Sequence, residues 1–321
     1  MNKKNVVYLF PGQGAQFPGM AMDLLESEAV KSLFNTASEI FGKDVKEILQ
    51  SDADTLKRTD VSQPAITVAN LAAAEYLKDK GFTPAACAGF SLGEYAAFVC
   101  AGIVSTADCF RLIKARGEAM QKASDKLRNA SGGDAAAAPG MAAIVGLAPE
   151  QVEELIAKWT KEGVKDLYAA NINSPKQLVV SGTAAALTEA ETRFKEAGAK
   201  RVIRLQVAGP FHSPLIADAA NDFSPTLESV KFSDPVIAVF SNVTGKKINS
   251  GDEAKKLALQ QITSPVRWVE EEASIAAGGY EACLEVGPGK VLQGLWKDSS
   301  PADGSGIPVF AAGTAEDISK L

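Results

Sequence analysis

Residues 85–95, AACAGFSLGEY, place the pattern Gly-x-Ser-x-Gly between a run of small apolar residues and a helix-forming segment. A strand before this pattern and a helix after it are typical of a nucleophile elbow, because the two glycines permit a tight turn that presents the serine hydroxyl. A glycine-rich turn with a capping serine is the alternative. The context favours Ser91 as a nucleophile, with the Leu92 N–H at a helix N-terminus where it can stabilise an oxyanion.

Strands and helices alternate on both sides of this motif, which indicates an α/β fold with a parallel sheet. The predicted strands are residues 6–10, 85–89, 236–240 and 282–286, and the predicted helices are residues 64–80, 92–101, 107–123 and 291–296.

The pattern changes between residues 139 and 208. An Ala/Gly/Ser-rich stretch at 124–140 predicts a flexible linker. The order that follows, strand–helix–strand–strand–helix–strand, is typical of a ferredoxin-like unit. We therefore expect a large α/β domain from residues 1–138 and 209–321, with a small ferredoxin-like subdomain, 139–208, inserted into it. The last twenty residues show no clear pattern.

Composition excludes several classes of function. The 321 residues carry a net charge of −6, which argues against nucleic acid as a partner. No stretch approaches the roughly 20 apolar residues of a membrane span, so we expect a soluble protein. The four cysteines form no C-x-x-C pair and there is one histidine, so we expect no metal site and a reducing compartment.

A serine hydroxyl needs a neighbouring base, and histidine is the usual one near neutral pH. His212 is the only histidine, so a histidine-activated Ser91 must use it. An exposed loop histidine is the alternative. However, His212 follows the last predicted strand of the subdomain, at a domain junction where active sites often form.

Two further segments could contribute to a site. Residues 11–16, PGQGAQ, end the first strand, and their glycines let backbone amides approach a ligand, although a plain turn explains them equally well. Arg116 lies on a predicted helix, where arginines are usually solvated. Only a buried Arg116 pointing into a cleft could bind a substrate carboxylate with both arms of its guanidinium.

Seven segments in order resemble one family over nearly the whole chain. They are residues 10–16 (FPGQGAQ), 63–66 (QPAI), 89–95 (GFSLGEY), 116–121 (RGEAMQ), 170–175 (ANINSP), 209–213 (GPFHS) and 285–292 (EVGPGKVL). Together they resemble the malonyl-CoA:acyl carrier protein transacylases of type II fatty acid synthesis. The resemblance implies an α/β-hydrolase-like core with an inserted ferredoxin-like subdomain, Ser91 as nucleophile and His212 as base. It also implies that the backbone carbonyl of Gln261 orients His212.

The same resemblance assigns the substrate contacts. Backbone N–H groups of Gln13 and Leu92 are expected to form the oxyanion hole, and Arg116 to pair with the malonyl carboxylate. Asn173 is expected to line the cleft. Phe211 is similar to the residue of malonyl-selecting members, whereas methylmalonyl-selecting relatives tend to have a smaller one.

The resemblance also implies malonyl-CoA and acyl carrier protein as partners, coenzyme A thioester as a substrate, and no cofactor. We expect a monomer in the bacterial cytoplasm or, after loss of a transit peptide, in the plastid stroma. Phe90 replaces a histidine common in bacterial members and is similar to plastid-type members. For docking the acidic carrier, Lys195, Lys200 and Arg201 are the candidate cations.

Two other functions fit the sequence. An esterase or thioesterase of the α/β-hydrolase type shares Gly-x-Ser-x-Gly but usually orients its histidine with an acidic residue. A binding module that has kept the fold would form no covalent adduct on Ser91.

Overall fold

The larger of two β-sheets is parallel throughout. The computed structural model describes residues 1–134, 136–301 and 306–321, and in these residues the sheet has the order β7-β2-β1-β8-β9. Its strands are β1 (Val6–Phe10), β2 (Pro84–Gly89), β7 (Ala238–Val239), β8 (Ala282–Glu285) and β9 (Val309–Ala311). All residues of the central strand β1 are buried, as expected for a parallel strand covered on both faces.

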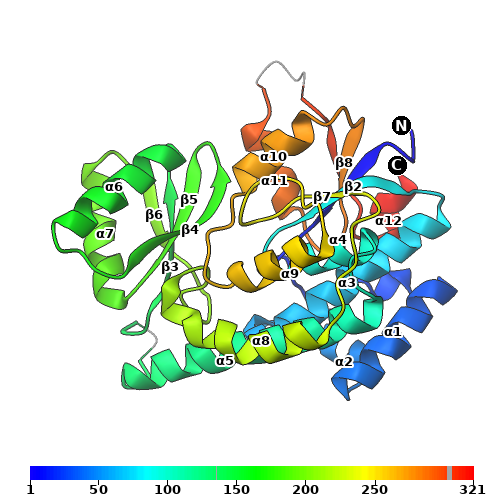
Figure 1. Ribbon diagram of the computed structural model, residues 1–321, viewed down its shortest axis with the longest axis horizontal. Helices are drawn as coiled ribbons and strands as arrows, with labels where there is room; N and C mark the ends of the chain where they lie inside the picture. The colour runs from blue at the N-terminus through cyan, green and yellow to red at the C-terminus, as the bar shows by residue number, and fades with distance from the viewer. Residues whose placement is uncertain (135, 302–305) are drawn as a thin grey trace.

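Helices cover both faces of this sheet (Figure 1). Val6, Tyr8 and Phe10 of β1 join one apolar cluster, and Val7 and Leu9 join another. The first cluster draws on α1 (Glu28–Phe41), α2 (Val45–Leu49), α3 (Thr59–Asp79), α4 (Gly93–Cys100), α5 (Thr106–Ala130), α8 (Ala217–Ser229), α9 (Gly251–Gln260) and α12 (Ala315–Ser319). The second draws on α10 (Trp268–Ala276) and α11 (Val291–Ser299).

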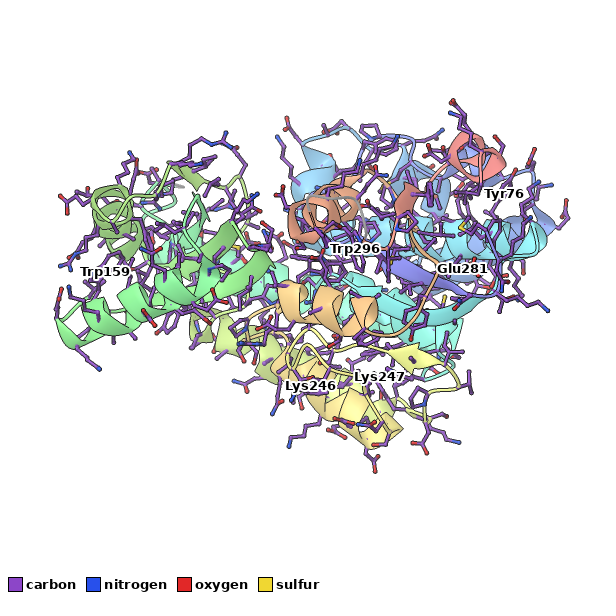
Figure 2. The ribbon with its side chains drawn as sticks, turned by 90° about the horizontal axis from the view of Figure 1, so that it is seen from above. Tyr76, Trp159, Lys246, Lys247, Glu281 and Trp296 are labelled. Atoms are coloured by element: carbon purple, nitrogen blue, oxygen red, sulfur yellow. The ribbon has the colours of Figure 1, made fainter. Side chains whose placement is uncertain are left out.

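The second sheet is antiparallel and lies at one end of the molecule in Figure 1. Its strands, in the order β4-β5-β3-β6, are β4 (Leu167–Ser174), β5 (Gln177–Gly182), β3 (Gly140–Val145) and β6 (Arg201–Arg204). Helices α6 (Pro149–Lys161) and α7 (Ala184–Glu196) share its apolar cluster, where Trp159 contacts Phe194 edge-on. Figure 2 shows Trp159 within this unit. Numbered within the unit, the strand order is 2-3-1-4, which is the ferredoxin-like order. The predicted fold class is confirmed.

The expected flexible linker at 124–140 is wrong over its first half. Helix α5 continues to Ala130, and α8 packs along it. Lys122 pairs with Asp222 at 2.7 Å and Lys126 pairs with Asp218 at 2.6 Å. Leu127 packs against the main apolar cluster. Only residues 131–139 separate α5 from β3, and residue 135 of that expected linker lies outside the described part of the chain.

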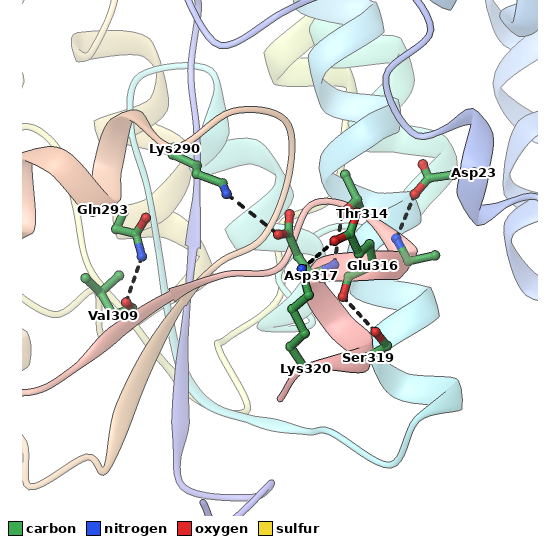
Figure 3. A network of polar contacts seen from close by, with 10 residues as sticks. Asp23, Lys290, Gln293, Val309, Thr314, Glu316, Asp317, Ser319 and Lys320 are labelled. Carbon is green, nitrogen blue, oxygen red and sulfur yellow. Dashed lines mark hydrogen bonds and ion pairs between the residues drawn. The ribbon is translucent and has the colours of Figure 1, made fainter.

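The last twenty residues contain two elements where no pattern was recognised. Strand β9 extends the parallel sheet, and the Gln293 amide donates to the Val309 carbonyl at 2.9 Å. Helix α12 is held at its N-terminus, where the Ala315 N–H donates to the Asp23 carboxylate at 2.7 Å (Figure 3). Residues 302–305 lie outside the described part of the chain.

No helix within the described ranges is long and apolar enough to cross a membrane.

The turn between β2 and α4 depends on glycine, since helix and strand backbones touch there. A Cβ on Gly93 would lie 2.1 Å from the carbonyl oxygen of Phe10, at the end of β1. A Cβ on Gly89 would lie 2.1 Å from the carbonyl carbon of Gly93. The first turn of α4 therefore lies directly against the central strand.

We predict that Gly93→Ala lowers the free energy of unfolding by about 3 kcal/mol or more, because backbone rather than a flexible side chain must move. Gly294→Ala, at an exposed α11 position with nothing within 4 Å of the added Cβ, is the matched control. It should be neutral or stabilising by up to about 1 kcal/mol. Urea unfolding of both variants checks this, and equal stabilities would contradict it.

Candidate active site

Ser91 lies at the bend between β2 and α4 with a φ of 52°, in the left-handed region. Non-glycine residues occupy this region at an energetic cost and do so most often at functional turns. The conformation matches the strained turn of a nucleophile elbow. The Ser91 Oγ faces a cavity.

His212 approaches Ser91 from the segment after β6. Its Nε2 lies 2.8 Å from Ser91 Oγ, and its Nδ1 lies 2.9 Å from the Gln261 carbonyl oxygen. A carbonyl can only accept, so Nδ1 carries the proton and Nε2 is left as the acceptor for the serine hydroxyl. Gln261 is the C-terminal cap of α9, so its carbonyl belongs to a helix end. A helix C-terminus favours a positive charge on the imidazole.

The surroundings of His212 keep the imidazole neutral. Burial, and secondarily the guanidinium of Arg116, lower the pKa of His212 from 6.5 to about 4. The hydrogen bond to Gln261 opposes this shift. At neutral pH the ring is therefore unprotonated, which is the form that can accept a proton from Ser91.

Two backbone N–H groups beside Ser91 have no acceptor. Among the described residues, neither the N–H of Gln13 nor that of Leu92 donates a hydrogen bond. Leu92 is the N-terminal cap of α4, and Gln13 lies in the loop after β1 and lines the cavity. Free N–H groups at a helix N-terminus and in an adjacent glycine loop can stabilise an oxyanion.

The cavity lies between the two sheets and has a volume of about 310 Å³. Gly12 and Gln13 contribute from the loop after β1 of the larger sheet, and Met141 and Val179 from strands of the smaller one. Of the residues predicted from the sequence, it is lined by Gln13, Ser91, Arg116, Asn173, Phe211 and His212. Leu92 and Gln261 lie behind this lining and contact it through Ser91 and His212.

Arg116 is fully buried, contrary to the usual solvated state of a helical arginine. Its guanidinium donates to the side-chain carbonyls of Gln63 at 2.8 Å and Gln261 at 2.9 Å, and lies over the Tyr95 ring. One Nη is 3.4 Å from Ser91 Oγ.

The charge of Arg116 has no carboxylate partner among the described residues. No ion pair includes it, and its Nε has no hydrogen-bond acceptor. Burial lowers the pKa of Arg116, although an arginine side chain keeps its charge at neutral pH. An unpaired buried cation beside a nucleophile suits a substrate that carries an anion.

Several polar residues behind Ser91 were missed in the sequence. Asn242 accepts from the Ser91 N–H, and Glu94 accepts from the Asn242 N–H and the Gln261 amide. Burial raises the pKa of Glu94 to about 8. Glu94 stands inside the recognised motif, and its place in an otherwise apolar helix could have marked it. Asn242 belongs to no recognised motif.

The expected docking cations do not line the cavity. Lys195 forms an ion pair with Glu191 at 2.8 Å. Arg201 lies opposite Val145 in the antiparallel sheet, at the end of β3 far from Met141, which lines the cavity. The cations near the cavity mouth are instead Lys57, Arg58, Arg128 and Arg204, which line an adjoining hollow of about 700 Å³.

The described residues contain no group of three or more His, Cys, Asp or Glu side chains that could hold a metal ion.

Comparisons with known proteins agree on one family. Residues 7–305 match the acyl transferase domain family. The malonyl CoA-acyl carrier protein transacylase of Bacillus subtilis is 39% identical, covering 91% of this chain and 89% of that protein. That of Synechocystis is 37% identical, covering 92% and 93%.

Solved structures give the same result. The malonyl CoA-acyl carrier protein transacylase of Coxiella burnetii is 30% identical with a TM-score of 0.88, covering 99% of this chain and 96% of that one. A malonyl-transacylase solved in complex with a type II PKS acyl-carrier protein is 32% identical with a TM-score of 0.87, covering 99% and 98%.

The lowered pKa of His212 predicts how the rate of Ser91 acylation depends on pH. Because the base is active when neutral, the rate should stay near its maximum as pH falls through 6.5, and decline only near pH 4 to 5. The initial rate of Ser91 acylation by a thioester substrate, measured at each pH, tests this prediction. Circular dichroism at the same pH values shows whether the protein is still folded. A half-maximal rate near pH 6.5 would show that His212 has an ordinary pKa.

Proposed function

This chain belongs to the malonyl CoA-acyl carrier protein transacylase family, and we propose that it transfers malonyl groups from malonyl-CoA to the phosphopantetheine thiol of an acyl carrier protein, in fatty acid biosynthesis. The observation that carries the proposal is the convergence of Ser91, His212 and an unpaired, fully buried Arg116 on one cavity. A serine activated by a histidine can accept and pass on an acyl group, and the guanidinium favours binding of an acyl group that carries a free carboxylate.

In the first half-reaction, Arg116 binds the carboxylate of malonyl-CoA. Ser91 Oγ attacks the thioester carbonyl carbon while His212 Nε2 takes the hydroxyl proton. The negative charge on the carbonyl oxygen is stabilised by the N–H groups of Gln13 and Leu92. The carbon–sulfur bond then breaks, His212 returns the proton to the coenzyme A thiolate, and a malonyl ester remains on Ser91.

In the second half-reaction the carrier's thiol enters the same cavity. Its ordinary pKa of about 8.5 leaves it mostly protonated at neutral pH, so His212 accepts its proton as the sulfur attacks the ester. The Ser91 oxygen leaves and is protonated by His212, which restores the enzyme. The two half-reactions form a ping-pong cycle with one covalent intermediate.

The orientation of His212 favours this function over an ordinary esterase. Hydrolases of the α/β type usually hold the histidine with an aspartate or glutamate. Here the acceptor at Nδ1 is the backbone carbonyl of Gln261. A thioesterase that releases malonate to water remains the alternative, and the fate of the acyl-enzyme separates the two.

Several features complete the proposal. The large domain comprises residues 1–138 and 209–321, and the small subdomain residues 139–208; the strands of the antiparallel sheet all fall within the latter. Asn173 lines the acyl pocket and Phe211 narrows it against branched acyl groups.

The protein acts as a monomer without a cofactor. We place it in the bacterial cytoplasm, a reducing compartment that suits its four free cysteines, since the relatives compared are bacterial; those relatives give no support to the plastid stroma.

We predict that brief mixing with malonyl-CoA adds one malonyl mass to the protein, and that Ser91→Ala abolishes the gain because it removes the hydroxyl that hydrogen-bonds to His212 Nε2. Intact-protein mass spectrometry measures the adduct before and after addition of holo acyl carrier protein, which should discharge it. Rapid release of free malonate without carrier would indicate a thioesterase. Neither adduct nor turnover would indicate a binding module.

Removing Arg116 should change the choice of acyl group. We predict that Arg116→Ala lowers kcat/KM for malonyl-CoA roughly 100-fold, or about 3 kcal/mol, while acetyl-CoA loses much less, because only malonyl pairs with the guanidinium. Arg116→Lys keeps the charge without the planar fork and should recover part of the malonyl rate. Equal losses for both thioesters would show that Arg116 acts on structure alone.

A further inference from the structure

The backbone at Ser91 is held by a side chain that does not reach the cavity. The Ser91 N–H donates to the Asn242 Oδ1 at 2.7 Å. Asn242 is fully buried and lies behind the elbow, outside the cavity lining. A left-handed serine is energetically unfavourable on its own, so contacts of this kind determine whether the turn persists.

The Asn242 amide spans the elbow. While its Oδ1 accepts from Ser91, its Nδ2 donates to the Gly89 carbonyl at 2.7 Å and to the Glu271 carboxyl at 2.8 Å. Its own backbone N–H donates to Glu94 at 2.9 Å. Two acceptors face Nδ2, and two donors face Oδ1, since the Gln261 Nε2 also lies 3.2 Å from it, so only one orientation of the amide satisfies its neighbours.

The chemistry of this position calls for a neutral amide. One atom must accept from residue 91 and the other must donate toward residue 89 and Glu271. An aspartate there would match the acceptor side but would place a second oxygen against two oxygens. Glu94 and Glu271 are both buried near it, and burial raises the pKa of each carboxyl, so an ionised aspartate there would lie among acidic groups instead of facing a cation. The guanidinium of Arg116 is separated from it by the Gln261 side chain, and that of Arg267, whose backbone N–H donates to the Asn242 carbonyl, pairs with Glu270.

We propose that Asn242 is a positioning residue for acyl transfer, which connects residues 89 and 91 so that the Ser91 hydroxyl stays aligned with His212 and the Leu92 N–H. The inference rests on the proposed function. Asn242 touches neither substrate nor reacting atoms, so its loss should slow the covalent step and leave thioester binding unchanged.

Asn242→Asp tests the proposal through pH. The variant can donate to Gly89 only while its carboxyl is protonated, so its maximal rate of malonyl-Ser91 formation should fall relative to wild type as pH rises from 5 to 9. We expect a loss of roughly 100-fold once Asp is ionised, within about tenfold of wild type when it is neutral. The concentration of malonyl-CoA giving half the maximal rate should change less than about threefold.

Three controls separate positioning from stability. Asn35→Asp makes the same chemical change at an exposed site on α1 and should follow wild type at every pH. Val152→Ala destabilises the small subdomain's core and should leave the acylation rate unchanged below its melting temperature. Thermal melts of every variant at each pH restrict the comparison to folded protein.

A second test variant, Asn242→Ala, cannot ionise and should lose roughly 100-fold in rate at all pH values.

A rate ratio of Asn242→Asp to wild type that does not vary with pH would overturn the proposal. A folded Asn242→Ala variant that forms malonyl-Ser91 at the wild-type rate would also overturn the proposal. This measurement is the deciding one if the aspartate variant unfolds. A raised half-saturating concentration with an unchanged maximal rate would also overturn it. Wild-type protein that forms no malonyl adduct would instead refute the proposed function.

Discussion

The contact between Gly93 and the carbonyl of Phe10 is the constraint on which the site depends. It holds the first turn of α4 against the central strand, so the end of β2 and the end of β1 meet at one edge of the sheet. Functional loops of parallel sheets gather at that edge. Ser91 and Leu92 follow β2 and Gln13 follows β1, so one backbone contact places the nucleophile beside two free N–H groups.

Neutral amides separate the buried ionisable groups around this edge. The Gln261 side chain accepts from Arg116 and donates to Glu94, so the guanidinium and the carboxyl are linked without forming an ion pair. Gln63 provides a second uncharged acceptor for Arg116. The site therefore carries an uncompensated positive charge, which lowers the pKa of His212 and favours an anionic acyl group.

Local signals explain which parts could be predicted from the sequence. The strand–elbow–helix pattern places Ser91, and a single histidine leaves His212 as the one candidate base, so both follow from residue identity. The extent of α5 was not predicted, because the Ala, Gly and Ser residues of 124–140 indicate a linker, whereas the packing of Leu127 against the main apolar cluster is a tertiary contact that the sequence does not show. Strand β9 is too short to show a pattern. Asn242 matters through contacts with residues about 150 positions away, as its bond to Ser91 shows.

The acceptor that orients His212 is part of the main chain. Every amino acid carries that carbonyl, so no substitution at position 261 deletes it. In a triad with an acidic residue, one codon determines the orienting group. Here the position of the orienting carbonyl is determined by all the residues that set the backbone conformation at the C-terminal end of α9. The orientation of the histidine is therefore maintained by the backbone of a helix end. Comparing the residue type at position 261 among relatives would not reveal this role.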